Sequence, residues 1–491
     1  MRKAVIGGLV ALLLTGCIAP PSQPVGRREA ELVKASLEDV FARDLQFIYE
    51  EIRDNYVNLP CKEQLLGFDW DELYAHYAAR LEEVETQKDF FLLASAFVSE
   101  LRDGHAALYP YRGRPEVEQE LYDFDPALKS LFAVRLIEGS PIIVESALPF
   151  PLVGAEILAI NGINFLELVE AASRHFFYGA TDRAAVERVM ADQYFLNYLA
   201  LVSGPFPGQL EIVFRSSDGR LGSFTLNAHQ PYAPDQPEPA QPLDPLPELA
   251  IEEGIALIRV PTFDVSSKEF GARLKAIEQE LKTAGVQGVV LDLRGNGGGN
   301  ESFRELLAYL VREETVVAAY RYRESPRFQE IYRLRPLYDL LLGRRRRGER
   351  EPGYSSWYHW TVQPKGEGVL RSLPAAVLVD RLVFSSADRF VGAVLEHDLA
   401  VVVGTEIALS GHGLSTPVLL PSGNYVLRYG FQELRDAQFA HLENQVREPH
   451  LFAEQTLADY HQGVDTALAQ AVAWLQVQGQ RVSRSTGSGV Q

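Results

Sequence analysis

A glycine-rich loop between an apolar strand and an amphipathic helix constrains this chain more than any other feature. Residues 289–291 are apolar and mostly β-branched, which predicts a buried strand. Residues 295–299 read Gly-Asn-Gly-Gly-Gly, and residues 303–310 have the apolar periodicity of a helix. Because glycines leave backbone N–H groups unshielded at a helix start, such a turn binds negative charge, either a phosphate or a developing oxyanion. The spacing is neither GxGxxG nor GxxxxGK[ST], which disfavours nucleotide binding.

The exact sequence of residues 291–299, LDLRGNGGG, is more diagnostic of a protein family than its glycine content alone. It resembles the tail-specific, or C-terminal-processing, serine peptidases, the family that also contains the tricorn core and the retinoid-binding protein of the eye. The resemblance implies a ClpP/crotonase-like α/β core, a mainly parallel sheet with helices, over residues 249–480. The alternation of strand and helix patterns in this region independently favours a mainly parallel, helix-covered sheet.

Residues 377–390 form the second motif, a strand followed by Ser385-Ser386-Ala387-Asp388 at the start of a helix. A serine at such a junction lies at the positive end of the helix and away from the core. The run resembles the family's nucleophile segment, which implies that Ser385 is the nucleophile. The family usually has Glu where this chain has Asp388. The alternative is that Ser385 and Ser386 only cap the helix.

A serine hydroxyl needs a base, and the family uses two solutions. Residues 404–413 lack the lysine of the Ser–Lys members. Residues 101–106, LRDGHA, resemble the histidine segment of the tricorn-like branch, which implies His105 as the general base. Residues 443–450 resemble the family's Glu-Asn-x-Gly-Val-x-Pro-Asp and imply Glu443 as a polar orienter. His412 is the rival base, since it occupies the turn where other members place their lysine.

The family uses two backbone N–H groups to hold the oxyanion, and the resemblance places them on Gly299 and Ser386. Each such donor is typically worth about 2.7–4 kcal/mol of transition-state stabilisation. A side chain added at Gly299 is therefore expected to damage the rate far more than the folding.

Several positions depart from the family pattern. Gly104 stands where tricorn has a serine, and Val446, Arg447 and His450 replace the family's Gly, Val and Asp. The family's fold also occurs as a non-catalytic binding scaffold. The alternative to a Ser–His peptidase that processes or degrades partly unfolded proteins is thus an inactive ligand- or protein-binding lipoprotein of the envelope.

The N-terminus resembles a bacterial lipoprotein signal. Residues 1–17 combine a basic start, a short apolar run and Leu14-Thr15-Gly16-Cys17, and the run is too short to span a membrane. Cys17 would be lipidated and become the mature N-terminus. Residues 18–31 form a Pro-rich tether. We expect a lipid-anchored protein of the cell envelope, on the periplasmic face of the outer membrane.

The remaining chain divides by pattern. Residues 32–110 have helical periodicity, and residues 130–229 alternate like strands around a helical insert. Within the second region, GAEILAING resembles the turn of PDZ modules, which implies a PDZ-like domain. Residues 230–248 contain seven prolines and predict a linker. Residues 481–491 predict a disordered tail.

Composition limits the partners. The net charge of −19 disfavours nucleic acid, and Cys61 alone permits no internal disulfide once Cys17 is lipidated. There is no HExxH motif, and the scattered His and carboxylate residues lack the spacing of metal ligands, which disfavours a metal site. No cofactor is expected. Protein or peptide substrates are the expected partners; the sequence does not specify the oligomeric state. Ten arginines in 321–350 predict a solvated surface segment or, alternatively, a site for acidic peptides or anionic lipid.

Overall fold

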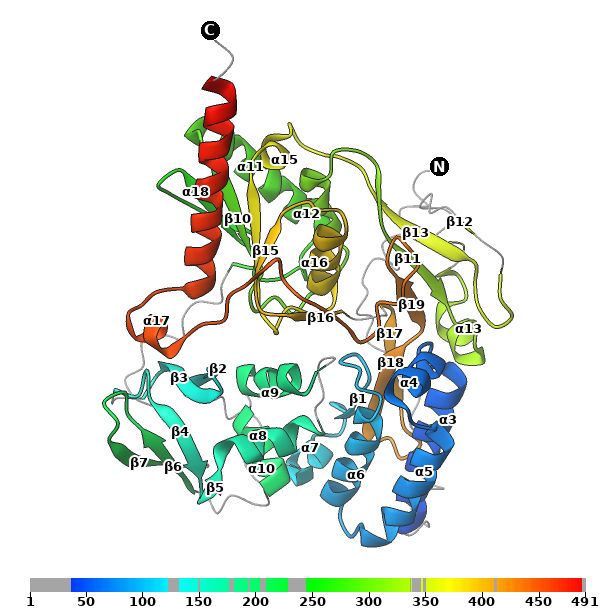
Figure 1. Ribbon diagram of the computed structural model, residues 1–491. Coiled ribbons are helices and arrows are strands. Elements are labelled where there is room, and N and C mark those ends of the chain that lie inside the picture. The colour runs from blue at the N-terminus through cyan, green and yellow to red at the C-terminus, as the bar shows by residue number, and fades with distance from the viewer. Residues whose placement is uncertain are drawn as a thin grey trace.

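A computed structural model gives the arrangement of the chain (Figure 1). It describes most of the molecule, in eleven segments. These are residues 37–121, 132–148, 151–175, 181–192, 195–203, 209–227, 244–335, 337, 346–347, 350–409 and 413–487. The signal, the tether, most of the Pro-rich linker, His412 and part of the arginine-rich segment lie outside the described residues.

A six-stranded sheet forms the centre of the C-terminal half. All neighbouring strands are parallel except the pair β8–β9 at one edge. This arrangement confirms the predicted α/β core with a mainly parallel sheet. In spatial order the strands are β21 (Leu451–Phe452), β15 (Val401–Gly404), β14 (Ala375–Val379), β10 (Gly288–Asp292), β9 (Ile255–Arg259) and β8 (Glu248–Glu252).

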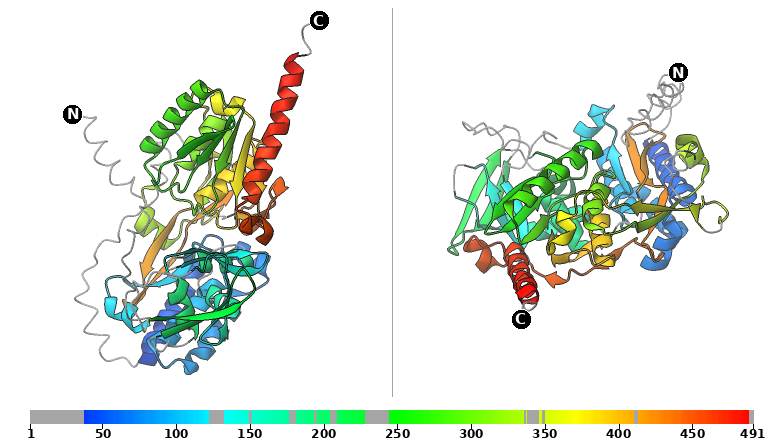
Figure 2. Two further views of the ribbon diagram at one scale, coloured as in Figure 1. Left: turned by 90° about the vertical axis from the view of Figure 1, so that its left-hand side faces the viewer. Right: turned by 90° about the horizontal axis from the view of Figure 1, so that it is seen from above.

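Helices cover both faces of this sheet because its strands are apolar on both sides. Val289 and Leu291 of β10 belong to the main core, whereas Val290 between them packs in the cluster that holds Ala471 and Leu475 of α18. Figures 1 and 2 show α18 alone on its face and extending beyond the body of the molecule. The helices are α11 (Ser267–Ala284), α12 (Phe303–Leu310), α15 (Val369–Ser372) and α16 (Ser386–Glu396) on one side, and α18 (Thr466–Gly487) on the other.

The chain is helical up to Gly487, so the tail predicted from residue 481 begins inside α18. The physical reason is that residues 481–486 contain neither Gly nor Pro, and a helix already nucleated over residues 466–480 propagates through them.

The N-terminal helical region does not form a separate packing unit. Its strand β1 (Ala107–Pro110) pairs antiparallel with β18 (Tyr425–Gly430), and its apolar side chains share one core with those of the peptidase region. Residues 32–110 and residues 249–480, which the sequence predicts as two domains, therefore share one hydrophobic core. The helices of this region are α3 (Leu37–Asn55), α4 (Leu59–Leu66), α5 (Trp70–Ala79), the 3-10 helix η2 (Arg80–Glu83), α6 (Gln87–Ser99) and α7 (Pro115–Leu121).

Smaller sheets complete the C-terminal half. One has the order β12 (Arg346–Arg347), β13 (Trp357–Val362), β11 (Thr315–Tyr322), β19 (Gln432–Arg435). Strand β17 (Ser415–Leu419) joins β18, and β16 (Ile407–Leu409) pairs with β20 (Gln445–Arg447). Two short helices, α13 (Pro326–Tyr332) and α17 (Leu457–His461), lie in the connections.

Residues 132–227 form a second module with a core of its own. In the described part of the stretch between its strands β5 and β6 there are three helices, and one of them, α9, faces the C-terminal half (Figure 1). Its elements are β2 (Phe132–Ile137), β3 (Ser140–Ser146), β4 (Glu156–Ile160), β5 (Ile163–Asn164), α8 (Phe165–Ser173), α9 (Asp182–Ala191), α10 (Phe195–Ser203), β6 (Gln209–Arg215) and β7 (Leu221–Asn227).

Among the described residues, no helix combines the length and the apolar character needed to cross a membrane. Within the same residues, no three His, Cys, Asp or Glu side chains converge as metal ligands would.

Candidate active site

Ser385 occupies the sharp turn between β14 and α16. Its backbone has φ +57° and ψ −120°, a strained conformation for a side chain with a Cβ. It is the residue before the first turn of α16, so the side chain is presented at the positive end of the helix dipole. The Ser385 Oγ lies 3.0 Å from Nε2 of His105. Two residues that are 280 positions apart in the chain are thus within hydrogen-bond distance.

The glycine-rich loop lies against this turn and is tied to it by Asn296. The buried amide of Asn296 donates to the Val260 carbonyl (2.9 Å) and accepts from the N–H of Gly298 (2.9 Å). Its backbone carbonyl accepts the N–H of Phe384 (3.1 Å). One side chain and its peptide group therefore hold the glycine loop and the residue before Ser385 together.

A second link uses Asp380, at the end of β14. Its Oδ1 accepts the N–H of Gly295 (3.0 Å) and the N–H of Leu382 (3.1 Å). Burial raises the pKa of the Asp380 carboxyl, and these two hydrogen bonds oppose the shift. The carboxyl group thus joins the first residue of the glycine loop to the turn that leads to Ser385.

Gly298 and Gly299 have different surroundings. A Cβ at Gly298, with φ +96°, would lie 2.7 Å from the Cβ of Ser385 and 2.8 Å from the Ser386 nitrogen. A Cβ at Gly299, with φ +143°, would lie 2.1 Å from the backbone nitrogen of Asp264. The expectation that a side chain at Gly299 would damage the rate more than the folding is therefore wrong, because Gly299 packs against main chain. Gly298 is the glycine whose missing side chain leaves room beside Ser385.

Gly299 and Ser386, the two residues expected to hold an oxyanion through their N–H groups, are directly hydrogen-bonded to each other through a side chain. Ser386 is the first residue of α16, and its hydroxyl donates to the Gly299 carbonyl (3.1 Å). This bond joins the glycine loop to the start of the helix.

His105 follows α6 in a short buried loop. Its ring stacks on Phe384, with centroids 4.5 Å apart and planes at 23°. The neighbouring carboxylate is Asp103, whose Oδ1 accepts the backbone N–H of His105 (2.8 Å) and lies 3.7 Å from Nδ1. The imidazole is thus held between the residue before Ser385 and an acidic side chain of its own loop.

Glu443 lies in the same buried region, close enough to Tyr56 to affect its ionisation. Its carboxylate accepts a hydrogen bond from the Asn58 amide (2.9 Å) and forms an ion pair with the fully buried ammonium of Lys62. Burial, and after it the Glu443 charge, raises the pKa of the nearby Cys61 thiol to about 11. Cys61 is therefore a neutral thiol at physiological pH.

The second module contributes an arginine to the turn that carries Ser385. The Arg188 guanidinium, on α9, donates to the carbonyls of Leu382 (2.9 Å) and Val383 (3.2 Å). It also lies over the ring of Phe384, 4.5 Å from the centroid. A stack therefore runs from Arg188 through Phe384 to His105.

An ion-pair network supports this contact. The buried Arg381 guanidinium pairs with Glu187 of α9 (3.1 Å), with Glu454 (2.8 Å) and with Glu406. Burial raises the pKa of the Glu187 carboxyl, and the charge of Arg381 opposes that shift. Carboxylates from three separate segments thus pair with the one guanidinium of Arg381, four residues before Ser385.

Replacing Arg188 with methionine should lower kcat by about ten-fold or more, because the carbonyls of the turn lose a charged donor worth about 1.5–3 kcal/mol. Steady-state kinetics on a chromogenic peptide would measure the loss. Arg215→Met is the matched control, since Arg215 lies on β6 of the same module and pairs only with Glu156 among the partners described. Equal activity of Arg188→Met and wild type would show that α9 does not support the turn.

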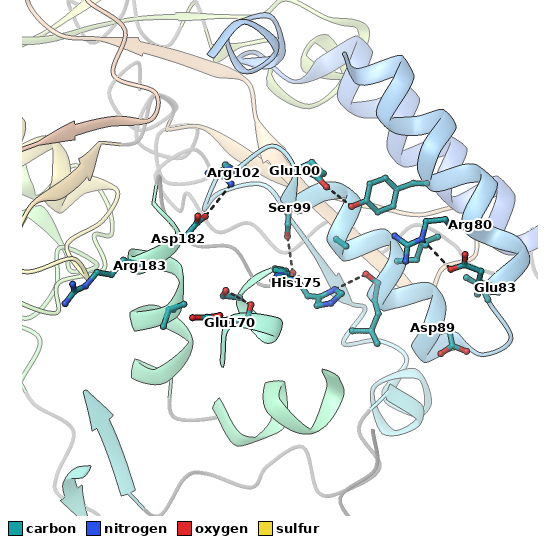
Figure 3. A pocket seen from close by; sticks show the side chains of 18 of the residues that line it. Arg80, Glu83, Asp89, Ser99, Glu100, Arg102, Glu170, His175, Asp182 and Arg183 are labelled. Carbon is teal, nitrogen blue, oxygen red and sulfur yellow. Dashed lines mark hydrogen bonds and ion pairs between the residues drawn. The ribbon is translucent and has the colours of Figure 1, made fainter. Parts of the chain in front are cut away.

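A hollow of about 1070 Å³ separates the helical region from the second module (Figure 3). Its walls include α6, α8 and α9, and the Arg102–Asp182 ion pair (3.5 Å) crosses it. His175 lies in one wall, where burial lowers its pKa while its hydrogen bond with the Leu92 carbonyl opposes the shift. Because Arg102 is three residues before His105, the loop of the candidate base borders this hollow.

Sequence reasoning did not single out several contributors to the site. Gly298 and Asn296 lie inside the glycine motif, and Asp103 lies inside the histidine segment, but none of them was assigned a role. Tyr56, Lys62 and Arg188 carried no local signal, since each acts on a segment far away in the sequence. His412 and Cys17 lie outside the described residues, so their roles stay predictions.

Comparisons with known proteins bear on the family and on the fold. Residues 254–451 match the model of peptidase family S41, and residues 38–98 match the tricorn protease C1 domain. A search of curated proteins finds no match. The fold is similar to that of mature CPAF, with a TM-score of 0.64 and 17% identity over 93% of this chain and 99% of that one. Mature CPAF complexed with lactacystin gives 0.65 and 17% over 91% and 99%.

The family S41 match covers both the glycine loop and Ser385, and the tricorn match ends seven residues before His105. The protein is thus a serine-type peptidase of the tail-specific, S41 type.

Proposed function

We propose that the protein is a serine endopeptidase that works through an acyl-enzyme formed on Ser385. The observation that carries the proposal is the 3.0 Å separation of Ser385 Oγ and His105 Nε2 at a strained strand–helix turn. His105 takes the hydroxyl proton as Oγ attacks the peptide carbonyl, and it then gives this proton to the leaving amine. Water attacks the resulting ester in the second half of the cycle.

The oxyanion of each tetrahedral intermediate is held by the N–H groups of Gly299 and Ser386. Two observations support this assignment. The Ser386 N–H is at the start of α16, and the space beside Ser385 stays open because Gly298 has no side chain.

The cellular setting is part of the proposal. Lipidation at Cys17 would hold the enzyme on the periplasmic face of the outer membrane, where it would trim or degrade partly unfolded proteins near their C-termini. The module of residues 132–227 would act as a PDZ-like domain with a helical insert, and the core would be ClpP/crotonase-like. The strand pattern of the module and the parallel sheet of the core support these assignments.

Labelling with a fluorophosphonate probe tests the proposal. Such probes phosphonylate an activated serine and release fluoride, so wild-type protein lacking residues 1–17 should be labelled, and mass spectrometry should place the label on Ser385. A folded protein that takes no label would instead favour the inactive, ligand- or protein-binding alternative. Label on another serine would refute the assignment of the nucleophile.

A further inference from the structure

Asp103 has two roles in the loop of the candidate base. Its Oδ1 accepts the backbone N–H of His105 (2.8 Å), which closes a tight side-chain turn. The same oxygen lies 3.7 Å from Nδ1 of the His105 ring, on the side away from Ser385. The carboxylate, 4% exposed, is therefore close enough to the imidazole to affect its charge with little screening by water.

Tyr56, one residue beyond α3, holds the other oxygen of this carboxylate. Its hydroxyl donates to Asp103 Oδ2 at 2.6 Å, and its side chain is fully buried. Burial, and after it the charges of Asp103 and Glu443, raises the pKa of the Tyr56 phenol well above its ordinary value. The phenol therefore stays protonated and remains a hydrogen-bond donor over the working pH range.

The main chain of the same loop is held from α4. The Lys62 ammonium donates to the carbonyl of Arg102 (3.0 Å), next to Asp103, while it also pairs with Glu443. Arg102 has a left-handed backbone, with φ +44°. The helical region thus fixes the loop at its main chain and at its acidic side chain.

We propose that Asp103, held by Tyr56, is the positioning residue of the general base. It would orient the His105 ring so that Nε2 faces Ser385, and it would stabilise the imidazolium formed when the proton of Ser385 Oγ moves to Nε2. The proposal rests on the Ser–His mechanism proposed above. It extends the catalytic contribution of the helical region from His105, the predicted base, to Asp103 and Tyr56.

Several polar or ionisable groups lie around the loop that carries His105. They are Ser385 of the turn, Arg188 of α9, Tyr56 and Lys62 of the helical region, and Glu443 of the loop before β20. The test therefore has to separate Asp103 from Glu443, another buried carboxylate close to Tyr56.

The pH dependence of kcat/KM for a chromogenic peptide distinguishes the role of Asp103 from that of Glu443. Asp103→Asn keeps an oxygen for the His105 N–H but removes the charge, so the loop can still close. We expect kcat/KM to fall about 10²- to 10⁴-fold, and the acid limb of the profile to move about one pH unit lower, because loss of a nearby negative charge disfavours the imidazolium. Tyr56→Phe should lower kcat about ten-fold with KM unchanged, since it removes one hydroxyl and no charge.

Glu443→Gln is the comparison variant, and circular dichroism with thermal melting establishes that each variant is folded. An acid limb that stays in place in Asp103→Asn but moves in Glu443→Gln would overturn the proposal and leave Glu443 as the orienting carboxylate. If no variant of Asp103 or Tyr56 changes the profile while Ser385→Ala abolishes activity, the inference fails and the Ser–His mechanism stands. Activity retained in Ser385→Ala would refute the mechanism itself.

Discussion

Ser385→Ala and His105→Ala should each reduce kcat by about 10⁴- to 10⁶-fold, and the double variant should lose no more than the worse of the two. The reason is geometric: Oγ and Nε2, 3.0 Å apart, form a single proton-transfer unit, so either change removes all of it. KM should change little, because both side chains act in the transition state and contribute little to the binding of the substrate in the ground state. Stopped assays at high enzyme concentration would measure the residual rates.

His412→Ala serves as the control for the base. We expect it to keep wild-type activity, since His105 already supplies an imidazole in contact with Ser385. The opposite pattern, with loss of activity in His412→Ala and retention in His105→Ala, would transfer the role of base to the turn at residues 404–413. Additive losses in the double variant would show that the two side chains do not act as one unit.

Gly298→Ala should lower kcat by about 10²- to 10³-fold, the loss that accompanies removal of an oxyanion donor. Its methyl group would lie 2.6 Å from the Phe384 carbonyl oxygen and 2.8 Å from the Ser386 nitrogen, both of which are main-chain atoms. The turn must shift, and the N–H of Ser386 must shift with it. A positive φ at Gly298 adds a folding cost of about 1–3 kcal/mol. Kinetics together with chemical denaturation separate the two effects.

The same loop provides two controls. At Gly297 an added Cβ meets nothing within 4 Å, so Gly297→Ala should keep both rate and stability. At Gly299 the added Cβ overlaps the main chain of residues 263–264, so Gly299→Ala should lose stability first. Equal kinetics in Gly297→Ala and Gly298→Ala would mean that the space beside Ser385 is not used by the oxyanion.

The fold around the glycine loop could be predicted because its signals are local. An apolar β-branched run, a cluster of glycines and a helical period are each complete within about ten residues, and β10 and α12 lie where those patterns placed them. The distinction between Gly298 and Gly299 could not be predicted. The two residues are chemically identical, and only their φ values and neighbours in the folded chain separate them.

The contacts that support the site were hidden for a different reason. Lys62 acts on Asn444, 382 residues later, and Arg188 acts on the carbonyl of Leu382, 194 residues later. A single polar residue inside an amphipathic helix has the same pattern as one that faces solvent, so periodicity does not identify its partner. A long-range contact of this kind becomes visible only when the elements are placed in space.

The pairing of β1 with β18 has a consequence for the life of the chain before it is complete. Ala107 lies opposite Arg428, so this part of the protein has contacts of very long sequence separation, which form late in folding. When synthesis of the chain has just passed His105, Ser385 has not yet been made. The strand β18, which pairs with the β1 strand that follows His105, has not been made either. The enzyme would therefore be silent throughout its own synthesis, because its topology assembles the site only from a finished polypeptide.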